Sequence, residues 1–273
     1  MRRVRVRTPE GVHVGEVVES LVVAGDRRIQ PLDVDTLELP PPYELLLPVE
    51  PPEVWCAGVT YERSRDARIE ESGSDVYARV YDAERPELFL KDAGCRRTVG
   101  PGGTIGIRGD SEWNVPEPEI GVVLGADGVL AALTIGNDVS SRAIEGANPL
   151  YLPQAKVYAG ACALGPALHV PDDWDAPLAI SMRILGADGK ALFAGETSTS
   201  RMRRSFGELV EWLLRDNPVP PGSVLLTGTG LVPPDDFTLE PGQRVEIHVP
   251  EIGTLANDVA LAMDLLERSS AHV

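Results

Sequence analysis

Three carboxylates dominate the chemistry that this sequence can support. Glu117 and Glu119 lie one residue apart, and Asp138 follows an apolar run at 130–135. Side chains two apart on a strand point to the same face, so Glu117 and Glu119 are expected to lie together. Burying carboxylates together is costly unless a cation or protons compensate. Three such groups would suit Mg²⁺ or Mn²⁺ and not zinc. The alternative is a solvated strand edge without a metal, which Pro118 also fits.

The overall charge limits the partners that this chain can have. Its 273 residues include 42 Asp and Glu but only 25 Lys and Arg, which gives a formal net charge of −17. Binding to nucleic acid or to an anionic membrane rewards clustered positive charge, so we expect neither partner. No apolar run approaches the roughly 20 residues that a membrane-spanning helix needs.

The N-terminal pattern and the cysteines both indicate a cytoplasmic protein. Residues 1–7 alternate charged and apolar side chains, which predicts a strand with one wet face and not a signal peptide. The cysteines, Cys56, Cys95 and Cys162, are odd in number and widely spaced, so they indicate neither a disulfide framework nor a metal-binding knuckle. We expect free thiols in a reducing cytoplasm.

Proline clusters divide the chain into two expected parts. Residues 1–50 have a strand-like pattern and end in prolines at 40–42 and 48–52, and such stretches stiffen a connector. We expect a small N-terminal domain at 1–50 and a larger, catalytic domain at 51–273. Strand-like runs dominate the larger part, at 88–90, 120–124, 130–135, 178–184, 223–226 and 244–249. The expected fold class is mainly β, of the α+β kind.

Helical patterns are fewer than strand patterns. The clearest helix is expected to begin after Ser200 and to end before Pro218. Its apolar face would contain Met202, Phe206, Leu209, Val210, Leu213 and Leu214. A second helix is expected at 61–72, where the side chains are almost all charged, and a third at 75–84. The charged helix has little apolar surface with which to pack, so it is a candidate lid.

An ordered set of motifs resembles the fumarylacetoacetate hydrolase superfamily. The Glu-x-Glu pair is followed by an apolar strand and by GNDVS at 136–140. Further matching pieces are LFLK at 88–91, VGPG at 99–102, Lys156 with ALGP at 163–166, LTGTG at 226–230, LEPG at 239–242 and IGTLAN at 252–257. The resemblance implies a mixed β-sandwich roll and a homodimer or homotetramer. It also implies a Mg²⁺ or Mn²⁺ ion held by Glu117, Glu119 and Asp138.

One departure from that superfamily concerns the activation of water. Its hydrolases carry the pattern Asn-Tyr-x-x-His-x-x-Glu, in which the His and Glu activate the water that cleaves a C–C bond. The matching stretch here is TYERSRDA at 60–67, so Ser64 and Ala67 occupy those two positions. No histidine lies between Cys56 and Pro166, and without imidazole another group must activate water near neutral pH. This departure weakens the case for hydrolysis of acylpyruvates, which is therefore kept only as the alternative to the activity described next.

A longer string resembles one branch of the superfamily. The sequence NPLYLPQAK at 148–156, with the stretches at 55–65 and 81–89, is similar to dehydratases of 2-keto-3-deoxy-D-arabinonate, equivalently 2-keto-3-deoxy-D-xylonate. The resemblance implies a metal-dependent lyase of oxidative pentose catabolism that forms 2,5-dioxopentanoate. A 2-keto acid can chelate a divalent ion through its carboxylate and C2 carbonyl, which acidifies the C3 protons before the C4 hydroxyl leaves.

Such a reaction needs a base at C3, an acid for the departing hydroxyl and a cation near the substrate carboxylate. Glu87 is the first acid/base candidate, because it precedes Lys91 by four residues and shares its face if both lie on a strand. Lys91 and Lys156 would neutralise substrate charge. Two alternatives remain open: Glu87 could be a surface carboxylate beside Arg85, and the lysines could simply balance the carboxylate cluster.

Three further residues are candidates for binding substrate. Thr229 lies in a Gly-Thr-Gly turn after an apolar strand and would donate a hydrogen bond, although a plain turn residue explains it too. Ser64 and Arg65 lie on the charged helix and would bind hydroxyl groups of the substrate. A solvated helix face accounts for these two residues equally well.

Overall fold

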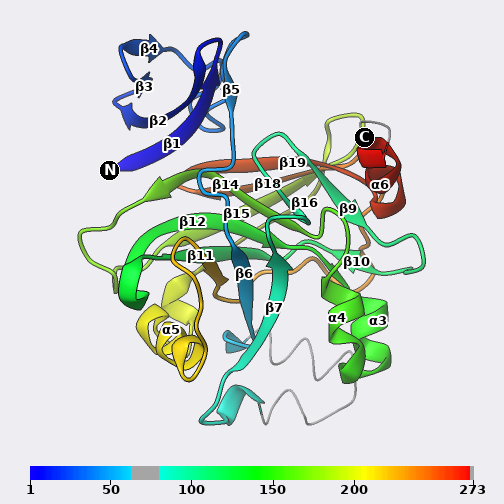
Figure 1. The fold of residues 1–273 in the computed structure, drawn as a ribbon. Coiled ribbons are helices and arrows are strands. Elements are labelled where there is room, and N and C mark those ends of the chain that lie inside the picture. Colours follow the sequence, from blue (N-terminus) through cyan, green and yellow to red (C-terminus); the bar gives the residue numbers. More distant parts are fainter. Residues whose placement is uncertain (63–79, 271–273) are drawn as a thin grey trace.

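Strands build most of the molecule, as the sequence predicts. The computed structural model describes residues 1–62 and 80–270. Within them the larger sheet contains β1 (Arg2–Thr8), β2 (Gly11–Val18), β3 (Leu21–Ala24), β4 (Arg27–Ile29), β5 (Glu44–Leu45), β6 (Glu53–Gly58), β7 (Glu87–Ala93), β8 (Thr98–Val99), β11 (Pro118–Leu124), β12 (Leu130–Asp138), β14 (Cys162–His169) and β17 (Val224–Leu226). Their principal order is β4-β3-β2-β1-β14-β12-β11-β17-β6-β7, with β5 on β1 and β8 on β14 (Figure 1).

A second sheet packs against the first. It contains β9 (Thr104–Ile107), β15 (Ala179–Leu185), β16 (Ala191–Ser198), β18 (Arg244–Val249) and β19 (Gly253–Leu261), in the order β16-β15-β18-β19-β9. Strand β19 lies against β14, and β18 lies against β12. Buried apolar side chains of both sheets, such as Val122, Ile135, Met182 and Ile247, form one continuous core. Because most pairs are antiparallel but β17–β6, β14–β8 and β19–β9 are parallel, the fold is the expected mixed β-sandwich.

The N-terminal strands extend the edge of the larger sheet. In β1 the side chains of Val4, Val6 and Thr8 are buried while the arginines between them face outward, which confirms the predicted strand with one wet face. β1 joins β14 through the pair Arg2–His169 and its neighbour. Figure 1 shows β1–β5 at one end of the molecule, beyond the two-sheet core. The division into domains at 1–50 and 51–273 stays a prediction.

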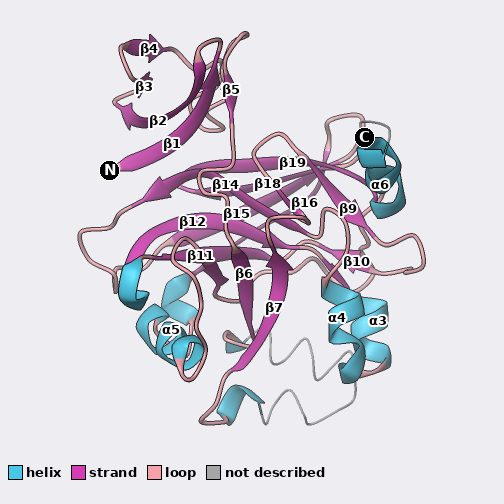
Figure 2. Cartoon of the chain, in the orientation of Figure 1, coloured by secondary structure: helices cyan, strands magenta, loops and turns pink. Residues whose placement is uncertain are grey.

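Helices lie at the edges of the sheets (Figure 2). A short pair of strands, β10 (Asn114–Val115) and β13 (Ser140–Ser141), precedes the first two of them. The described helices are α3 (Arg142–Ala147), α4 (Leu152–Lys156), α5 (Phe206–Leu214) and α6 (Ala262–Ser270), with 3-10 turns η1 (Ala126–Gly128), η2 (Pro149–Tyr151) and η3 (Thr199–Arg201). Among the described residues, none of these helices has the length and apolar composition to cross a membrane.

The clearest predicted helix begins later than expected. The hydroxyl of Ser205 accepts a hydrogen bond from the Glu208 N–H at 3.1 Å, so this serine caps α5 and Phe206 is its first residue. Met202 has extended backbone angles and lies outside the helix, because a 3-10 turn ends just before it. The prediction of a start after Ser200 is therefore wrong. The helices predicted at 61–72 and 75–84 lie largely outside the described residues.

Candidate metal centre

The three predicted carboxylates meet in the structure. Glu117 lies in the link before β11, Glu119 lies on β11, and Asp138 ends β12. The two strands are antiparallel with Pro118 opposite Asn137, so the start of one lies beside the end of the other. One oxygen from each carboxylate lies within 4.8 Å of the others, and all three side chains are buried. The sheet register therefore brings together groups that are nineteen or more positions apart in the chain.

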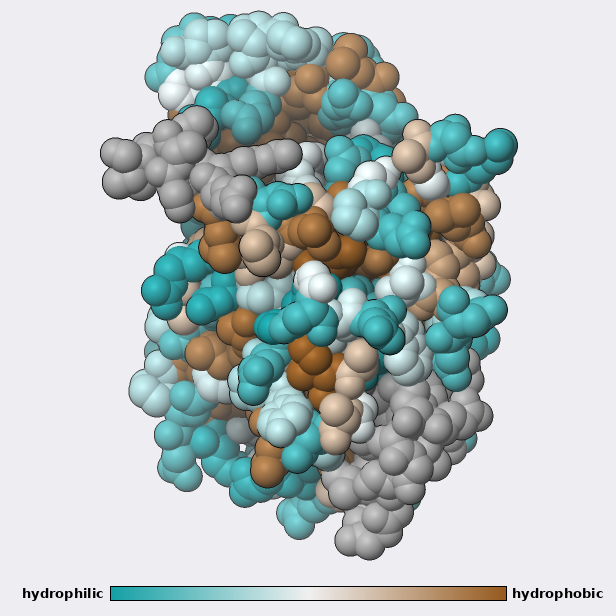
Figure 3. Space-filling view, turned by 90° about the vertical axis from the view of Figure 1, so that its right-hand side faces the viewer, coloured by the Kyte–Doolittle hydropathy of each residue, from teal (hydrophilic) through white to brown (hydrophobic). Residues whose placement is uncertain are grey.

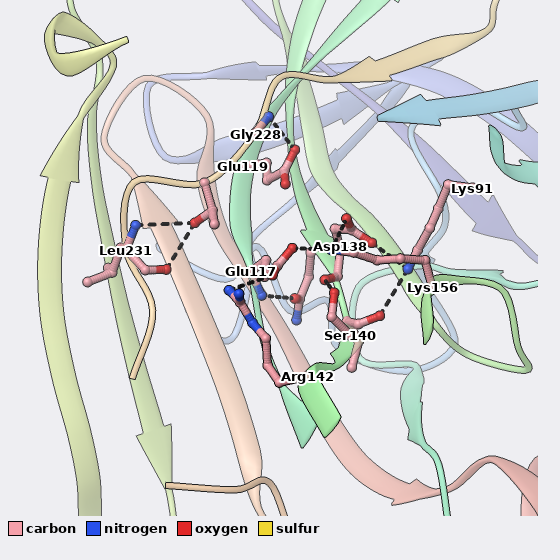
Figure 4. Close-up of polar contacts among 12 residues, drawn as sticks. Lys91, Glu117, Glu119, Asp138, Ser140, Arg142, Lys156, Gly228 and Leu231 are labelled. Atoms are coloured by element: carbon pink, nitrogen blue, oxygen red, sulfur yellow. Dashed lines mark hydrogen bonds and ion pairs between the residues drawn. The ribbon is translucent and has the colours of Figure 1, made fainter. Parts of the chain in front are cut away.

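Two cations hold Glu117 from opposite sides. Lys156, the last residue of α4, places its Nζ 2.5 Å from Glu117 Oε2 and 2.9 Å from Asp138 Oδ2. Arg142, the first residue of α3, places its Nη2 2.8 Å from Glu117 Oε1. Figure 4 shows Arg142 and Lys156 beside the carboxylates. Both cationic side chains are 3% exposed, so water screens these ion pairs little. The Lys156 ammonium lies between two of the three predicted metal ligands.

Lys91 contacts the carboxylate cluster from outside the cavity. It is fully buried, forms an ion pair with Asp138 Oδ1 and donates a hydrogen bond to the Val139 carbonyl at 2.9 Å. In the β6–β7 pair, Trp55 lies opposite Leu90 and Val54 lies opposite the residue after Lys91, which leaves Lys91 as the extra residue of a β-bulge. A bulge redirects a side chain. Simple strand alternation therefore does not describe how Lys91 is aimed.

Glu119 has a backbone partner and no ion pair among the described residues. The Gly228 N–H donates to its Oε2 at 2.6 Å (Figure 4). Gly228 has φ +91, and an added Cβ would lie 2.0 Å from Thr60 Oγ1, so only glycine allows this approach. Burial raises the pKa of Glu119 well above its usual range, and the charges of Asp138 and Glu117 raise it further. A bound cation would stabilise the charged form of Glu119 and so oppose both the burial and the repulsion by Asp138 and Glu117.

The carboxylates border a small cavity of about 20 Å³, which is room for one water or ion. Its polar lining includes five carboxyl groups, on Glu87, Glu117, Glu119, Asp138 and Glu145. Three cations of the described part contact this cluster, on Lys91, Arg142 and Lys156. The three carboxylates Glu117, Glu119 and Asp138 offer oxygen donors alone, and such a donor set fits Mg²⁺ or Mn²⁺.

The other predicted site residues are only partly placed. Glu87, the first residue of β7, and Thr229 both line the cavity. The Thr229 hydroxyl donates to the Leu231 carbonyl at 2.9 Å and accepts from the Leu231 N–H at 3.2 Å, so it also organises its turn (Figure 4). Ser64 and Arg65 lie outside the described residues.

Two buried residues of the cavity were not found from the sequence. Arg142 and Glu145 are each 3% exposed and lie one turn apart on α3. Ser141 caps this helix by accepting from the Ile144 N–H at 3.3 Å. A serine directly before a helix is a start signal, and this one follows Asp138 by three residues. That signal would have placed Arg142 and Glu145 beside the carboxylates.

Comparisons with known proteins agree with this geometry. The family model for the C-terminal domain of fumarylacetoacetate (FAA) hydrolase matches residues 53–260. A probable 2-keto-3-deoxyxylonate dehydratase of Haloferax volcanii is 52% identical over 215 residues, covering 78% of this chain and 74% of that protein. A 2-dehydro-3-deoxy-D-arabinonate dehydratase of Saccharolobus solfataricus is 46% identical over 219 residues, covering 78% and 73%.

Solved structures extend the similarity to nearly the whole chain. A crystal form of 2-keto-3-deoxyarabinonate dehydratase has a TM-score of 0.85 at 37% identity, covering 96% of this chain and 99% of that one. A 2-keto-3-deoxy-D-arabinonate dehydratase complexed with magnesium and 2,5-dioxopentanoate has a TM-score of 0.83 at 36% identity, with the same coverage. Fold, motif order and carboxylate placement lead to one conclusion: the chain belongs to the fumarylacetoacetate hydrolase family.

Proposed function

We propose that this chain is a lyase that dehydrates 2-keto-3-deoxy-D-arabinonate, equivalently the D-xylonate compound, to 2,5-dioxopentanoate in oxidative pentose catabolism. The observation that carries the proposal is one cavity in which Glu87 and Lys156 face the buried trio Glu117, Glu119 and Asp138. The relatives with 46% and 52% identity are named for this dehydration, which supports the same reaction here.

The trio Glu117, Glu119 and Asp138 would hold Mg²⁺ or Mn²⁺. When bound, the ion would polarise the C2 carbonyl of a 2-keto acid and so make the C3 protons more acidic. The protein fixes the three carboxylates beforehand: Arg142 binds Glu117, Lys91 binds Asp138, and the Gly228 N–H binds Glu119. Residues outside the trio thus orient each carboxylate before the cation enters.

Glu87 is the residue that we propose for proton transfer. Dehydration removes one proton from C3 and the hydroxyl from C4, which leaves as water once it is protonated. The resulting enone then loses one proton from C5 and one from the C5 hydroxyl and gains one each at C3 and C4, which gives the aldehyde of 2,5-dioxopentanoate. A carboxylate can accept the first proton and return it to the departing hydroxyl when both lie within hydrogen-bond reach. Glu87 lines the cavity from the β7 edge, apart from the three carboxylates proposed as ligands. It is not one of the three residues proposed to hold the metal.

Lys156 is the cation that we propose for the substrate. Its Nζ lies in the cavity wall between Glu117 and Asp138, where it would stabilise the substrate carboxylate or the charge that develops on the C2 oxygen. Lys91 does not line the cavity, so we propose that it acts by orienting Asp138. Thr229 would donate a hydrogen bond to the substrate once its hydroxyl turns away from the Leu231 carbonyl. Ser64 and Arg65 would bind the hydroxyl groups of the substrate.

The direct test uses the purified protein with Mg²⁺ and 2-keto-3-deoxy-D-arabinonate. Formation of 2,5-dioxopentanoate is followed by NMR or by its oxidation in a coupled aldehyde dehydrogenase assay. Chelation by EDTA should stop the reaction, and added Mg²⁺ should restore it. No aldehyde from this substrate, with cleavage of an acylpyruvate in parallel samples, would replace the dehydratase proposal by the hydrolase alternative.

We also propose that the protein is a cytoplasmic homodimer or homotetramer. The face seen in Figure 3 presents apolar side chains between the hydrophilic ones. Helix α6 and the α3–α4 connection contribute exposed apolar residues to the surface, namely Leu150, Tyr151, Met263 and Leu266. Such residues favour association. All three cysteines are free, which suits a reducing compartment. Light scattering coupled to size exclusion gives the number of subunits.

A further inference from the structure

Residues Met202, Arg203 and Arg204, which precede α5, connect to the ends of two strands of the active cavity. Met202 forms an isolated antiparallel bridge with Tyr61, and the Arg203 N–H donates to the Thr60 carbonyl at 3.0 Å. The Thr60 hydroxyl in turn donates to the Thr227 carbonyl at 2.7 Å, next to the glycine that binds Glu119. These contacts hold Thr60 and Tyr61, which follow β6, in place.

The same three residues also hold the chain just before β7. Arg203 forms an ion pair with Asp82 at 3.2 Å. Arg204 is 9% exposed; its guanidinium donates to the Ala83 carbonyl and, at 3.0 Å, to the Glu84 carbonyl. It is itself fixed by an ion pair with Glu208 on α5. Through Arg204, hydrogen bonds therefore link two consecutive carbonyls to helix α5, only a few residues before β7 begins.

Glu87 is the first residue of β7, so its position depends on this approach. It pairs with Gly58 at the end of β6, and a Cβ added to Gly58 would lie 2.1 Å from Glu87 Oε2. The carboxylate therefore lies directly over the Gly58 backbone, and a side chain at position 58 would displace it. Pro86 is buried and restricts the backbone between Glu84 and Glu87 further.

We infer that Arg204 is a positioning residue for Glu87, acting through the Ala83 and Glu84 carbonyls. The inference rests on the proposed function, because it assumes that Glu87 transfers protons in the dehydration. Arg204 does not line the cavity and does not contact the three carboxylates of the metal centre. Its loss should therefore displace the acid/base group and leave metal binding intact. A misplacement of about 1 Å costs on the order of 10²-fold in rate.

The test is a double-mutant cycle on the full-length protein. Arg204→Met should lower kcat about tenfold to a hundredfold, with KM and the Mg²⁺ Kd changed less than about twofold. In a Glu87→Gln background the same substitution should lower kcat no further, because its target has been removed. Arg215→Met is the matched control: Arg215 also pairs with a glutamate of α5, Glu211 at 3.0 Å, but within the described part of the chain no hydrogen bond joins it to the Ala83 or Glu84 carbonyl. Its kcat should stay near that of the wild type.

Each alternative outcome is distinct. If Arg204→Met lowers kcat by the same factor in the wild-type and Glu87→Gln backgrounds, Arg204 has a general structural role and the inference is overturned. An Arg204→Met variant with the kcat of the wild type would overturn it too. If Arg204→Met folds poorly, Arg204→Lys retains one donor and should show a smaller kcat loss that also disappears with Glu87→Gln. An inactive wild type with bound Mg²⁺ would instead reject the proposed reaction, which separates that failure from failure of the Arg204 role.

Discussion

Replacing Lys156 by methionine tests the charge balance of the site most directly. The substitution keeps much of the side-chain length and removes an ammonium that lies 2.5 Å from Glu117 and 2.9 Å from Asp138. Both partners are at most 3% exposed, so each would become a buried charge without this cation. Removing one partner of a buried ion pair costs about 3–5 kcal/mol. We expect a loss of that size in the free energy of unfolding of metal-free protein.

Magnesium should reverse part of this loss. Glu117 and Asp138 contact the ammonium and are also two of the residues that would hold the ion, so the ion would supply positive charge where Lys156 no longer does. A ligand at 100 times its Kd stabilises the folded state by about 2.7 kcal/mol. Since the variant has more uncompensated charge, its Mg²⁺ affinity should be retained or increased. Activity should not return, because loss of one preorganised donor lowers kcat about 10²–10³-fold.

The assay is urea unfolding in EDTA and in saturating Mg²⁺, combined with steady-state kinetics. Lys190→Met serves as the control, because Lys190 pairs with Asp188 at 2.7 Å but is 82% exposed. Exposed pairs contribute about 0–1 kcal/mol, so this variant should resemble the wild type in both buffers. An equal loss of stability with and without Mg²⁺, together with near-normal kcat and KM, would refute the reasoning and show that Lys156 only balances the charge of the carboxylates.

Three further predictions follow from individual residues. Glu119→Gln should abolish both Mg²⁺ binding and turnover, because ligand charge sets the affinity of an oxygen site. Isothermal titration checks this, with the exposed Glu112→Gln as control. Unchanged Mg²⁺ affinity would remove Glu119 from the ligand set. The wild type should show no appreciable acylpyruvate hydrolysis, since Ser64 and Ala67 replace the water-activating pair; turnover comparable with dehydration would contradict this. Burial, and next the N-terminal ammonium, lower the pKa of His169 below its usual 6.5. Neutral His169 therefore contributes to the free energy of unfolding above pH 6.5. This contribution is lost as the pH falls through the lowered pKa of His169, because the unfolded chain binds the proton first. His169→Gln should reduce the slope of unfolding free energy against pH in that range, and an unchanged slope would show that other groups cause it.

Local pattern identified the strands but misjudged one helix start. Alternation in residues 2–8 and the apolar runs of β11, β12 and β18 depend on burial of one strand face or both, which the sequence records directly. The start of α5 depends on the Ser205 hydroxyl and a 3-10 turn before it, and the apolar spacing of Met202 concealed both. Helix ends are set by such local hydrogen bonds, which periodicity does not record.

The sequence by itself determined the trio Glu117, Glu119 and Asp138 and the absence of a histidine beside it, because residue type fixes ligand and acid/base chemistry. Tertiary structure decided how that chemistry is surrounded. The β-bulge turns Lys91 onto Asp138, and the cap at Ser141 starts the helix that brings Arg142 to Glu117. These contacts join strands and helices far apart in the chain, and they follow from sheet register and helix packing. No local pattern encodes either, since both arise from the burial of the whole core.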